Sequence, residues 1–236
     1  MDPIEKALKL RKSLPLKSKD PFWAFHSRLQ RSAVVMRIVE QHSKSNTALY
    51  EARRQYVVAL CAAFEIYWRD FIKVTLDRYH PREGQLKNLR TYKFSFWELQ
   101  QILGHRLTLG ELVSAAFTFQ GTAVVNTVAH DIFNFDLFGI LAAKRFKITV
   151  DFLEPRNSAS EQTLSHTIEG TQVLKSRIFI ERCFTIRHET VHDTGVRFRP
   201  SKTTVGRMAA AMNLFNLIAS LVFEQEVEKN CQDKLP

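Results

Sequence analysis

One short segment of the chain, residues 187 to 192, has residue types and spacing that suit acid–base or metal chemistry. It begins with Arg187, His188 and Glu189 and ends at His192. Read as H-E-x-x-H on a helix, its two histidines share a face, where both imidazoles can hold zinc while Glu189 polarises a zinc-bound water. Read from Arg187, the segment joins a permanent cation, whose planar fork matches phosphate oxygens, to a histidine, a residue type that can act as a base near neutral pH.

The zinc interpretation needs a third ligand. The longer metzincin pattern continues to a glycine, which Gly195 matches, but its third histidine position is occupied by Phe198. Another zincin type takes the third ligand from a downstream glutamate, for which Glu224 and Glu226 are the candidates. Zincin domains also usually carry a sheet beside the motif helix, and the sequence indicates no convincing one. A zinc metallopeptidase is therefore an alternative prediction.

The segment that starts at Arg187 resembles the R-x(4–6)-H signature of the HEPN superfamily, helical bundles that include many metal-independent endoribonucleases. Residues 64–71, FEIYWRDF, resemble the E-x-x-x-R stretch in the second helix of the RiboL-PSP-type HEPN branch. Residues 108–120, TLGELVSAAFTFQ, resemble the midsection of the same branch. The resemblance covers about residues 45 to 225 as an ordered series of elements.

This resemblance implies a homodimer in which two R-x(4–6)-H motifs face each other across one cleft. In each copy His192 is expected to act as the base on the ribose 2′-OH and Arg187 to stabilise the phosphorane charge, with His188 positioning both. On an uninterrupted helix Arg187 and His192 lie about 140° apart. We therefore expect the helix to loosen before Gly195 so that they converge. The implied products are a 2′,3′-cyclic phosphate and a 5′-OH, with no metal or cofactor.

Three further residues are predicted to support the catalytic pair. The resemblance makes Glu65 a partner that orients Arg187 or His192, with Arg69 beside it, and Glu189 lies within the motif. Glu65 and Arg69 are also spaced as an i, i+4 pair, so the alternative interpretation is an ordinary helix ion pair of small value.

The charge balance favours an anionic partner. The chain has 34 Lys and Arg against 24 Asp and Glu, a formal charge of +10, which is typical of proteins that meet nucleic acid or a membrane surface. Clusters of Lys and Arg side chains on a protein surface contact phosphates without reading bases. The cluster that follows the motif is predicted to bind RNA and consists of Arg197, Arg199, Lys202 and Arg207. A second basic stretch lies at Lys73, Arg78, Arg82, Lys87, Arg90 and Lys93, and nearby aromatic residues that can stack on bases or belong to the core are Tyr79, Tyr92, Phe94 and Trp97.

Composition and targeting signals limit the class of protein. The chain has 236 residues, 45% of them hydrophobic, and 18 Phe, enough for a real core. Three scattered cysteines make no disulfide framework and favour a reduced, cytoplasmic protein. The start has no apolar signal region, and the apolar run at 209–223 is short for a membrane span and predicts a buried helix. Motifs of nucleotide-dependent enzymes and serine hydrolases are absent from the sequence.

The elements that must position these residues are helices. Hydrophobic periodicity and caps predict helices at 21–43, 46–79, 96–105, 108–117, 131–143, 171–190 and 203–228. Thr108 and Glu111 form a predicted capping box. Alternation over 146–152 fits a short strand or a terminal helical turn. We expect a basic N-terminal tail, 1–19, and a single all-α, HEPN-like helical domain, 20–230, with long antiparallel helices and short midsection helices.

The sequence therefore predicts a cytoplasmic, metal-independent endoribonuclease that forms a homodimer and needs no cofactor or membrane. Proteins that resemble it commonly serve as toxins of toxin–antitoxin pairs or as anti-phage effectors, so a cognate antitoxin or another regulatory protein is a candidate partner. In one large HEPN group the antitoxin modifies a Tyr just after the motif, but here Asp193, Thr194 and Gly195 follow. The alternatives are a catalytically silent HEPN module that binds RNA or protein, and the zinc metallopeptidase.

Overall fold

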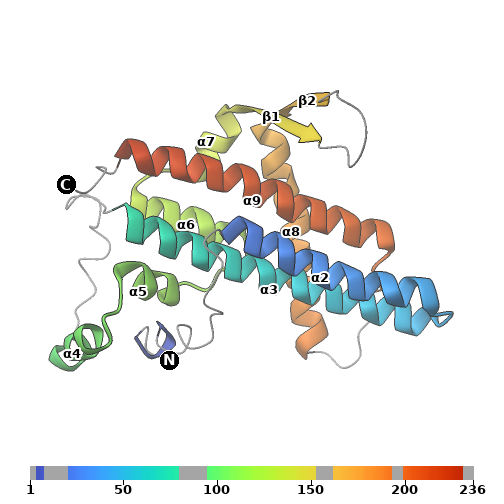
Figure 1. Ribbon diagram of the computed structural model, residues 1–236, viewed down its shortest axis with the longest axis horizontal. Helices are drawn as coiled ribbons and strands as arrows, with labels where there is room; N and C mark the ends of the chain where they lie inside the picture. The colour runs from blue at the N-terminus through green and yellow to red at the C-terminus, as the bar shows by residue number, and fades with distance from the viewer. Residues whose placement is uncertain (1–3, 8–20, 80–94, 153–161, 193–198, 231–236) are drawn as a thin grey trace.

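The computed structural model describes residues 4–7, 21–79, 95–152, 162–192 and 199–230, and these residues form an all-α bundle, as predicted. Its long helices are α2 (Pro21–His42), α3 (Asn46–Arg78), α8 (Gly170–His192) and α9 (Lys202–Asn230). Figure 1 shows α2 lying along α3, with α9 running beside them and α8 crossing the bundle. The short helices are α4 (Phe96–His105), α5 (Leu109–Ala116), α6 (Thr122–Phe133) and α7 (Leu137–Ala143).

Helix α3 is the centre of the core because its apolar residues recur every three or four positions. Ser45 caps its start by accepting a hydrogen bond from the Ala48 amide. The stripe that this periodicity produces is fully buried and includes Val57, Leu60, Phe64, Trp68 and Ile72.

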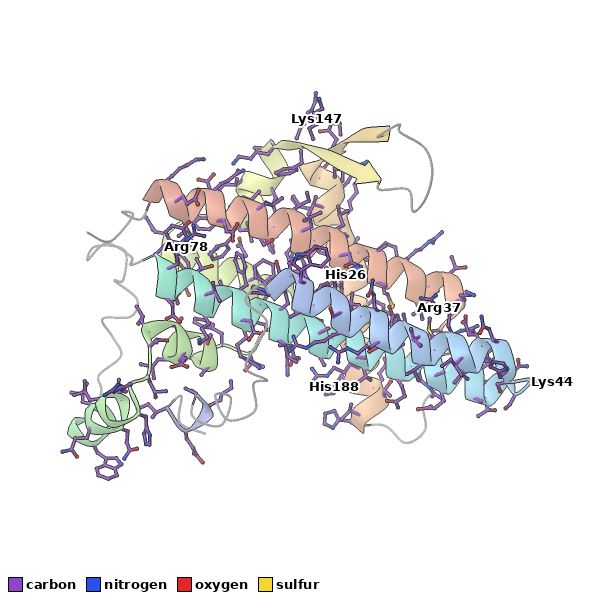
Figure 2. The ribbon with its side chains drawn as sticks, in the orientation of Figure 1. His26, Arg37, Lys44, Arg78, Lys147 and His188 are labelled. Carbon is purple, nitrogen blue, oxygen red and sulfur yellow. The ribbon has the colours of Figure 1, made fainter. Side chains whose placement is uncertain are left out.

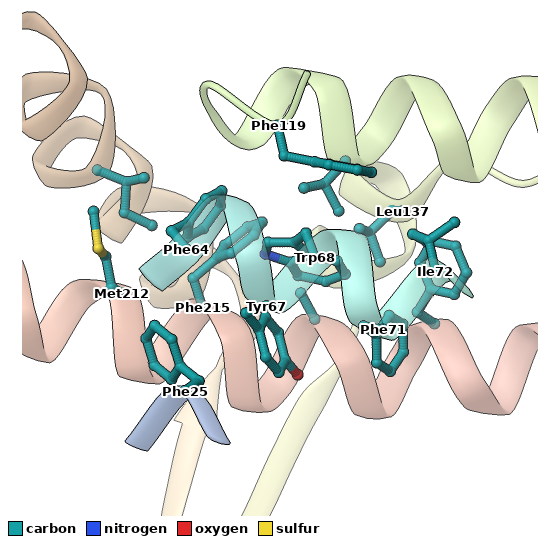
Figure 3. Packing of buried hydrophobic residues seen from close by; sticks show 14 of the residues in the cluster. Phe25, Phe64, Tyr67, Trp68, Phe71, Ile72, Phe119, Leu137, Met212 and Phe215 are labelled. Atoms are coloured by element: carbon teal, nitrogen blue, oxygen red, sulfur yellow. The ribbon is translucent and has the colours of Figure 1, made fainter. Parts of the chain in front are cut away.

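Aromatic side chains of α3 pack against those of α9 (Figure 3). The Trp68 ring lies 6.0 Å from the ring of Phe215, and its indole N–H donates to the Asn216 side-chain oxygen at 2.9 Å. That bond satisfies a polar group inside an apolar core and fixes the rotation of one helix against the other. Among the described helices, α9 is long and apolar enough to cross a membrane, and 56% of its apolar window is buried in the bundle.

Helix α5 packs closely on α3 because its second residue is glycine. The capping box is present, with Thr108 accepting from the Glu111 amide and Glu111 accepting from the Thr108 amide. The Gly110 amide donates to the Asp77 carboxylate at 3.1 Å, and a Cβ at Gly110 would collide with the Lys73 carbonyl. A close approach of two helix backbones is therefore built on this glycine.

The first described residues, 4–7, form a short helical segment that packs on the bundle. Ile4 and Ala7 are buried in a small apolar cluster with Leu107 and Ala115. This part of the expected basic tail is thus packed against α5 and the turn before it, and residues 8–19 lie outside the described part of the chain.

The prediction of a single helix at 131–143 is wrong, because two helices, α6 and α7, occupy this region. Helix α6 was not predicted. Helix α6 ends at Phe133 because Asn134 adopts the left-handed conformation, with φ 59° and ψ 41°. Its start has no side-chain cap of its own. Instead, the Glu181 carboxylate of α8 accepts from both the amide and the hydroxyl of Thr122, at 3.0 and 2.7 Å. Because the capping carboxylate comes from a residue 59 positions after Thr122, the start of α6 has no local sequence signal.

The alternation over 146–152 does form a strand, β1 (Arg145–Phe152), which pairs antiparallel with β2 (Gln162–Glu169). Strand β2 was not predicted, since its mostly polar residues lack a clear apolar alternation. At the base of the hairpin Phe146 faces Ile168 across the strands, and both pack against the core. The hairpin feeds directly into α8 at Gly170, where a side chain would collide with the Leu141 carbonyl.

Candidate active site

Helix α8 carries the motif in its last turns and runs without interruption to His192. Its buried face consists of Val173, Ser176, Ile180, Cys183 and Ile186. After Ile186 the helix projects from the core, so that His188, Val191 and His192 are exposed and Arg187 is half-buried. Figure 2 shows His188 at this free end of α8. The expected loosening before Gly195 does not occur up to His192, and Gly195 lies outside the described residues.

Arg187 is held by Glu65 of α3. Its Nη1 donates to Glu65 Oε1 at 2.5 Å, and the two side chains are 29% and 13% exposed. The structure therefore brings together two residues that are 122 positions apart and that the sequence analysis had paired. A guanidinium has five N–H donors, so the remaining donors of Arg187 stay available to another acceptor.

Two thiols lie one helical turn before this ion pair. Cys61 precedes Glu65 by four residues and Cys183 precedes Arg187 by four, and both cysteines are buried and free. A hydrogen bond to Cys183 raises the pKa of the Cys61 thiol, and burial raises it further. The Cys61 thiol thus stays neutral, and the two buried cysteines add polarisable, weakly polar surface beside the charged pair.

His188 and His192 form a second pair on the exposed side of the same turns. Their ring centroids are 4.6 Å apart, with 48° between the ring planes. Since α8 stays helical, Arg187 and His192 lie about 140° apart around its axis. Within one copy, Arg187 therefore faces α3 while His192 faces solvent. The two side chains do not come together in the structure.

The candidates for a third zinc ligand are on the wrong end of the molecule. Glu226 accepts from Lys144 Nζ at 3.0 Å, and the Lys144 carbonyl accepts from the Gly170 amide, which starts α8. His192 lies about 33 Å further along that helix, at 1.5 Å per residue. Glu224 precedes Glu226 by two residues on α9. Neither glutamate can join His188 and His192, and the described residues contain no cluster of three metal-ligating side chains.

The basic residues after the motif contact α2 and α3 rather than Arg187. Lys202 pairs with Glu40 at 3.0 Å, and the Arg199 guanidinium lies over the Tyr50 ring at 5.6 Å. Arg207 is exposed on α9, and Arg197 lies outside the described residues. Glu40 also pairs with Arg53, which precedes Glu65 by 12 positions or about 18 Å of helix. These cations are thus a separate part of the surface.

The second basic stretch and its aromatics divide between core and surface. Lys73 pairs with Asp77 at 3.6 Å and with Glu111 at 3.9 Å, so it helps to hold α5 on α3. Tyr79 is buried, and its hydroxyl donates to Glu228 at 2.6 Å, so this aromatic belongs to the core. Trp97 of α4 is exposed, as is Arg78. The other members, Arg82, Lys87, Arg90, Tyr92, Lys93 and Phe94, lie outside the described residues.

Of the remaining predicted residues, Arg69 is the most informative. Glu65 is engaged by Arg187, while Arg69 Nε is buried with no hydrogen-bond partner among the described residues. Glu189 is half-buried in the last turn of α8. Sequence reasoning missed two further cations, Lys6 and Arg28. Arg69 acts on the pKa of Lys6, and Arg28 acts together with Arg69 on the pKa of Asp70. These residues come together through the packing of separate helices, which leaves no local sequence signal.

Comparison with known proteins gave no significant match. No family model, no curated protein and no solved structure matches the chain. The function therefore has to be argued from the chain's own residues.

Proposed function

We propose that this protein is a metal-independent endoribonuclease of the HEPN type, in which two copies combine their motifs into one active site. The observation that carries the proposal is the ion pair between Arg187 and Glu65. It fixes a half-buried arginine at the edge of the core, one turn from an exposed histidine pair. A toxin or an anti-phage effector is the role that this activity suggests.

The reaction needs only groups that these residues provide. His192, as the neutral imidazole, takes the proton from a ribose 2′-OH, and the 2′ oxygen attacks the adjacent phosphorus. The bond from phosphorus to the 5′ oxygen breaks, leaving a 2′,3′-cyclic phosphate. A protonated imidazole, supplied by His188 or by the other copy, returns a proton to the leaving 5′ oxygen. Arg187 donates to the phosphate oxygens while negative charge builds on them.

A homodimer accounts for the split orientation of the motif. The Arg187 and His192 side chains of one copy leave α8 in directions about 140° apart. The arginine of one copy and the histidine of another can meet across a twofold axis that passes near the ends of the two α8 helices. Val191, which lies between the two histidines in the sequence, is 61% exposed and offers apolar surface for such a contact.

The test is cleavage of single-stranded RNA in EDTA by the purified chain and four variants. We expect the parent to cut, and Arg187→Ala and His192→Ala to lose about 100-fold or more in rate. Matched controls are Arg31→Ala and His130→Ala, which alter exposed residues on α2 and α6, and these should cut like the parent.

Three outcomes would overturn the proposal. They are no cleavage by the parent, cleavage that EDTA abolishes, and equal activity in the Arg187 or His192 variants. Binding of RNA without cleavage would favour the silent HEPN module. Stoichiometric zinc by elemental analysis, with Glu189→Ala the most damaging change to peptide hydrolysis, would favour the peptidase.

A further inference from the structure

The turn of α3 that follows Glu65 gathers cations from three separate parts of the chain. We name it the Arg69 cluster, and its members are linked by their electrostatic effects on Lys6 and Asp70: Lys6 of the first segment, Arg28 of α2, and Glu65, Arg69 and Asp70 of α3. Arg69 lies one turn after Glu65 and thus on the same side of α3, where α8 brings Arg187. The cluster is therefore adjacent to the proposed catalytic arginine.

Two arginines in this cluster each have a buried nitrogen atom that donates to no acceptor in the described part of the chain. Arg28 Nη1 and Arg69 Nε are both shielded from solvent and have no hydrogen-bond partner among the described residues. A buried donor without an acceptor destabilises the folded state, because it has lost its hydrogen bonds to water and gained none in return. Arg28 and Arg69 both act on Asp70. Two such donors around one carboxylate indicate that a further acceptor belongs there, and an anionic acceptor suits them best.

The first segment brings Lys6 to the same place. Burial of Ile4 and Ala7 against Leu107 and Ala115 anchors the segment on the bundle. Burial lowers the pKa of Lys6, nearby Arg69 lowers it further, and Glu65 raises it. Lys6 is thus within electrostatic reach of both α3 residues and reinforces the positive charge around Arg69.

The carboxylates of the cluster do not balance its cations. Glu65 is engaged by Arg187. Burial raises the pKa of Asp70, while Arg28, Arg69 and Lys73 act to lower it. Lys73 has its own partners in Asp77 and Glu111. Counted over its described members, the cluster and the adjoining Arg187 thus contain four cations and two carboxylates, and burial raises the pKa of one of these carboxylates, Asp70.

We propose that the Arg69 cluster binds a phosphate group of the RNA chain, next to the phosphate that Arg187 contacts. This inference rests on the proposed function and adds to it a second contact between the protein and the RNA backbone. A phosphate brings acceptor oxygens for the two unpaired arginine nitrogens and charge for Lys6. Because such contacts set register without reading bases, the cluster positions the strand so that the scissile bond reaches Arg187.

The test measures binding without cleavage. A short, fluorescently labelled RNA with every 2′-OH methylated cannot be cut, so the intact parent chain can be used. Anisotropy titrations between about 50 and 200 mM salt give the slope of log affinity against log salt concentration. We expect Arg69→Gln and Lys6→Gln each to weaken binding and to reduce that slope by about 0.7, the value for one lost phosphate contact on a single strand.

Arg31→Gln, an exposed change elsewhere on α2, is the matched control and should keep the parental slope. Lys6→Gln lies outside α3 and keeps the test valid if Arg69→Gln unfolds. Parental slopes in both cluster variants would overturn the inference, as would weaker binding explained by a lower melting temperature alone. If the slope falls but the unmethylated RNA is not cut, the proposed function fails and the phosphate site stands. If RNA is cut but both slopes are parental, the site fails and the nuclease stands.

Discussion

At the scale of single residues, Glu65 is the residue that connects the proposed catalytic arginine with the Arg69 cluster. It is the acceptor that fixes Arg187, and it lies one helical turn from Arg69, whose buried Nε has no hydrogen-bond partner within the residues that the structure describes. In the proposed nuclease, Glu65 would hold Arg187 in its reactive position in advance, so that little ordering would remain when substrate binds.

Replacing Glu65 by Gln removes its charge but keeps an oxygen acceptor. We expect kcat for RNA cleavage to fall about 10- to 100-fold with little change in KM, because Arg187 stays present but is less firmly held. Glu65→Ala should cost more in rate, and its free energy of unfolding should drop by about 1–3 kcal/mol. Rates equal to the parent in both variants would show that Glu65 does not position Arg187.

At the scale of elements, the site depends on how α3, α5 and the first segment fit together. Gly110 sets the distance between α5 and α3, and α5 in turn supplies part of the apolar surface that anchors Ile4 and Ala7. A change at this glycine therefore reaches Lys6 through packing, without touching any charged residue.

We expect Gly110→Ala to lower the free energy of unfolding by about 1–3 kcal/mol, because the new Cβ meets the Lys73 carbonyl. Gly104→Ala is the matched control. Nothing lies within 4 Å of a Cβ there, and alanine favours the α4 helix, so stability should stay level or rise by up to about 1 kcal/mol. Urea denaturation of both variants checks the pair, and equal stabilities would contradict the close packing.

The elements that the sequence predicts well are those whose signals are local. The apolar stripe from Val57 to Ile72 and the capping box at Thr108 both depend on neighbours within a few positions. The break at Asn134 and the start of α6 depend on a left-handed residue and on a distant carboxylate, Glu181. The same difference holds for the site: Arg187 and Glu65 follow from a motif, whereas Lys6 and Arg28 come together only through tertiary packing.

At the scale of the whole molecule, two carboxylates fasten helices that are remote in sequence. Glu40 of α2 accepts from Arg53 of α3 and pairs with Lys202 of α9. Glu226 accepts from Lys144, just before the hairpin, and from Lys229. Burial alone raises the pKa of each, but these hydrogen bonds hold both pKa values below the usual 4.5.

A carboxylate with a lowered pKa in the folded state stabilises the fold above its unfolded pKa and loses that contribution as pH falls through the folded value. We therefore expect the free energy of unfolding to be level near neutral pH and to decline as the solution is acidified through about pH 4.5 and below. Glu40→Gln should flatten that decline and lower stability at pH 7. A decline as steep in the variant as in the parent would remove Glu40 as its cause.

The placement of the three tryptophans makes the molecule its own optical probe. Trp68 is fully buried with its N–H bonded to Asn216, whereas Trp23 and Trp97 are 64% and 67% exposed. Trp23→Phe combined with Trp97→Phe leaves a single emitter in the core, whose emission shifts to longer wavelength only when α3 separates from α9. Coincidence of that signal with loss of helical circular dichroism would establish whether the bundle unfolds as one cooperative unit.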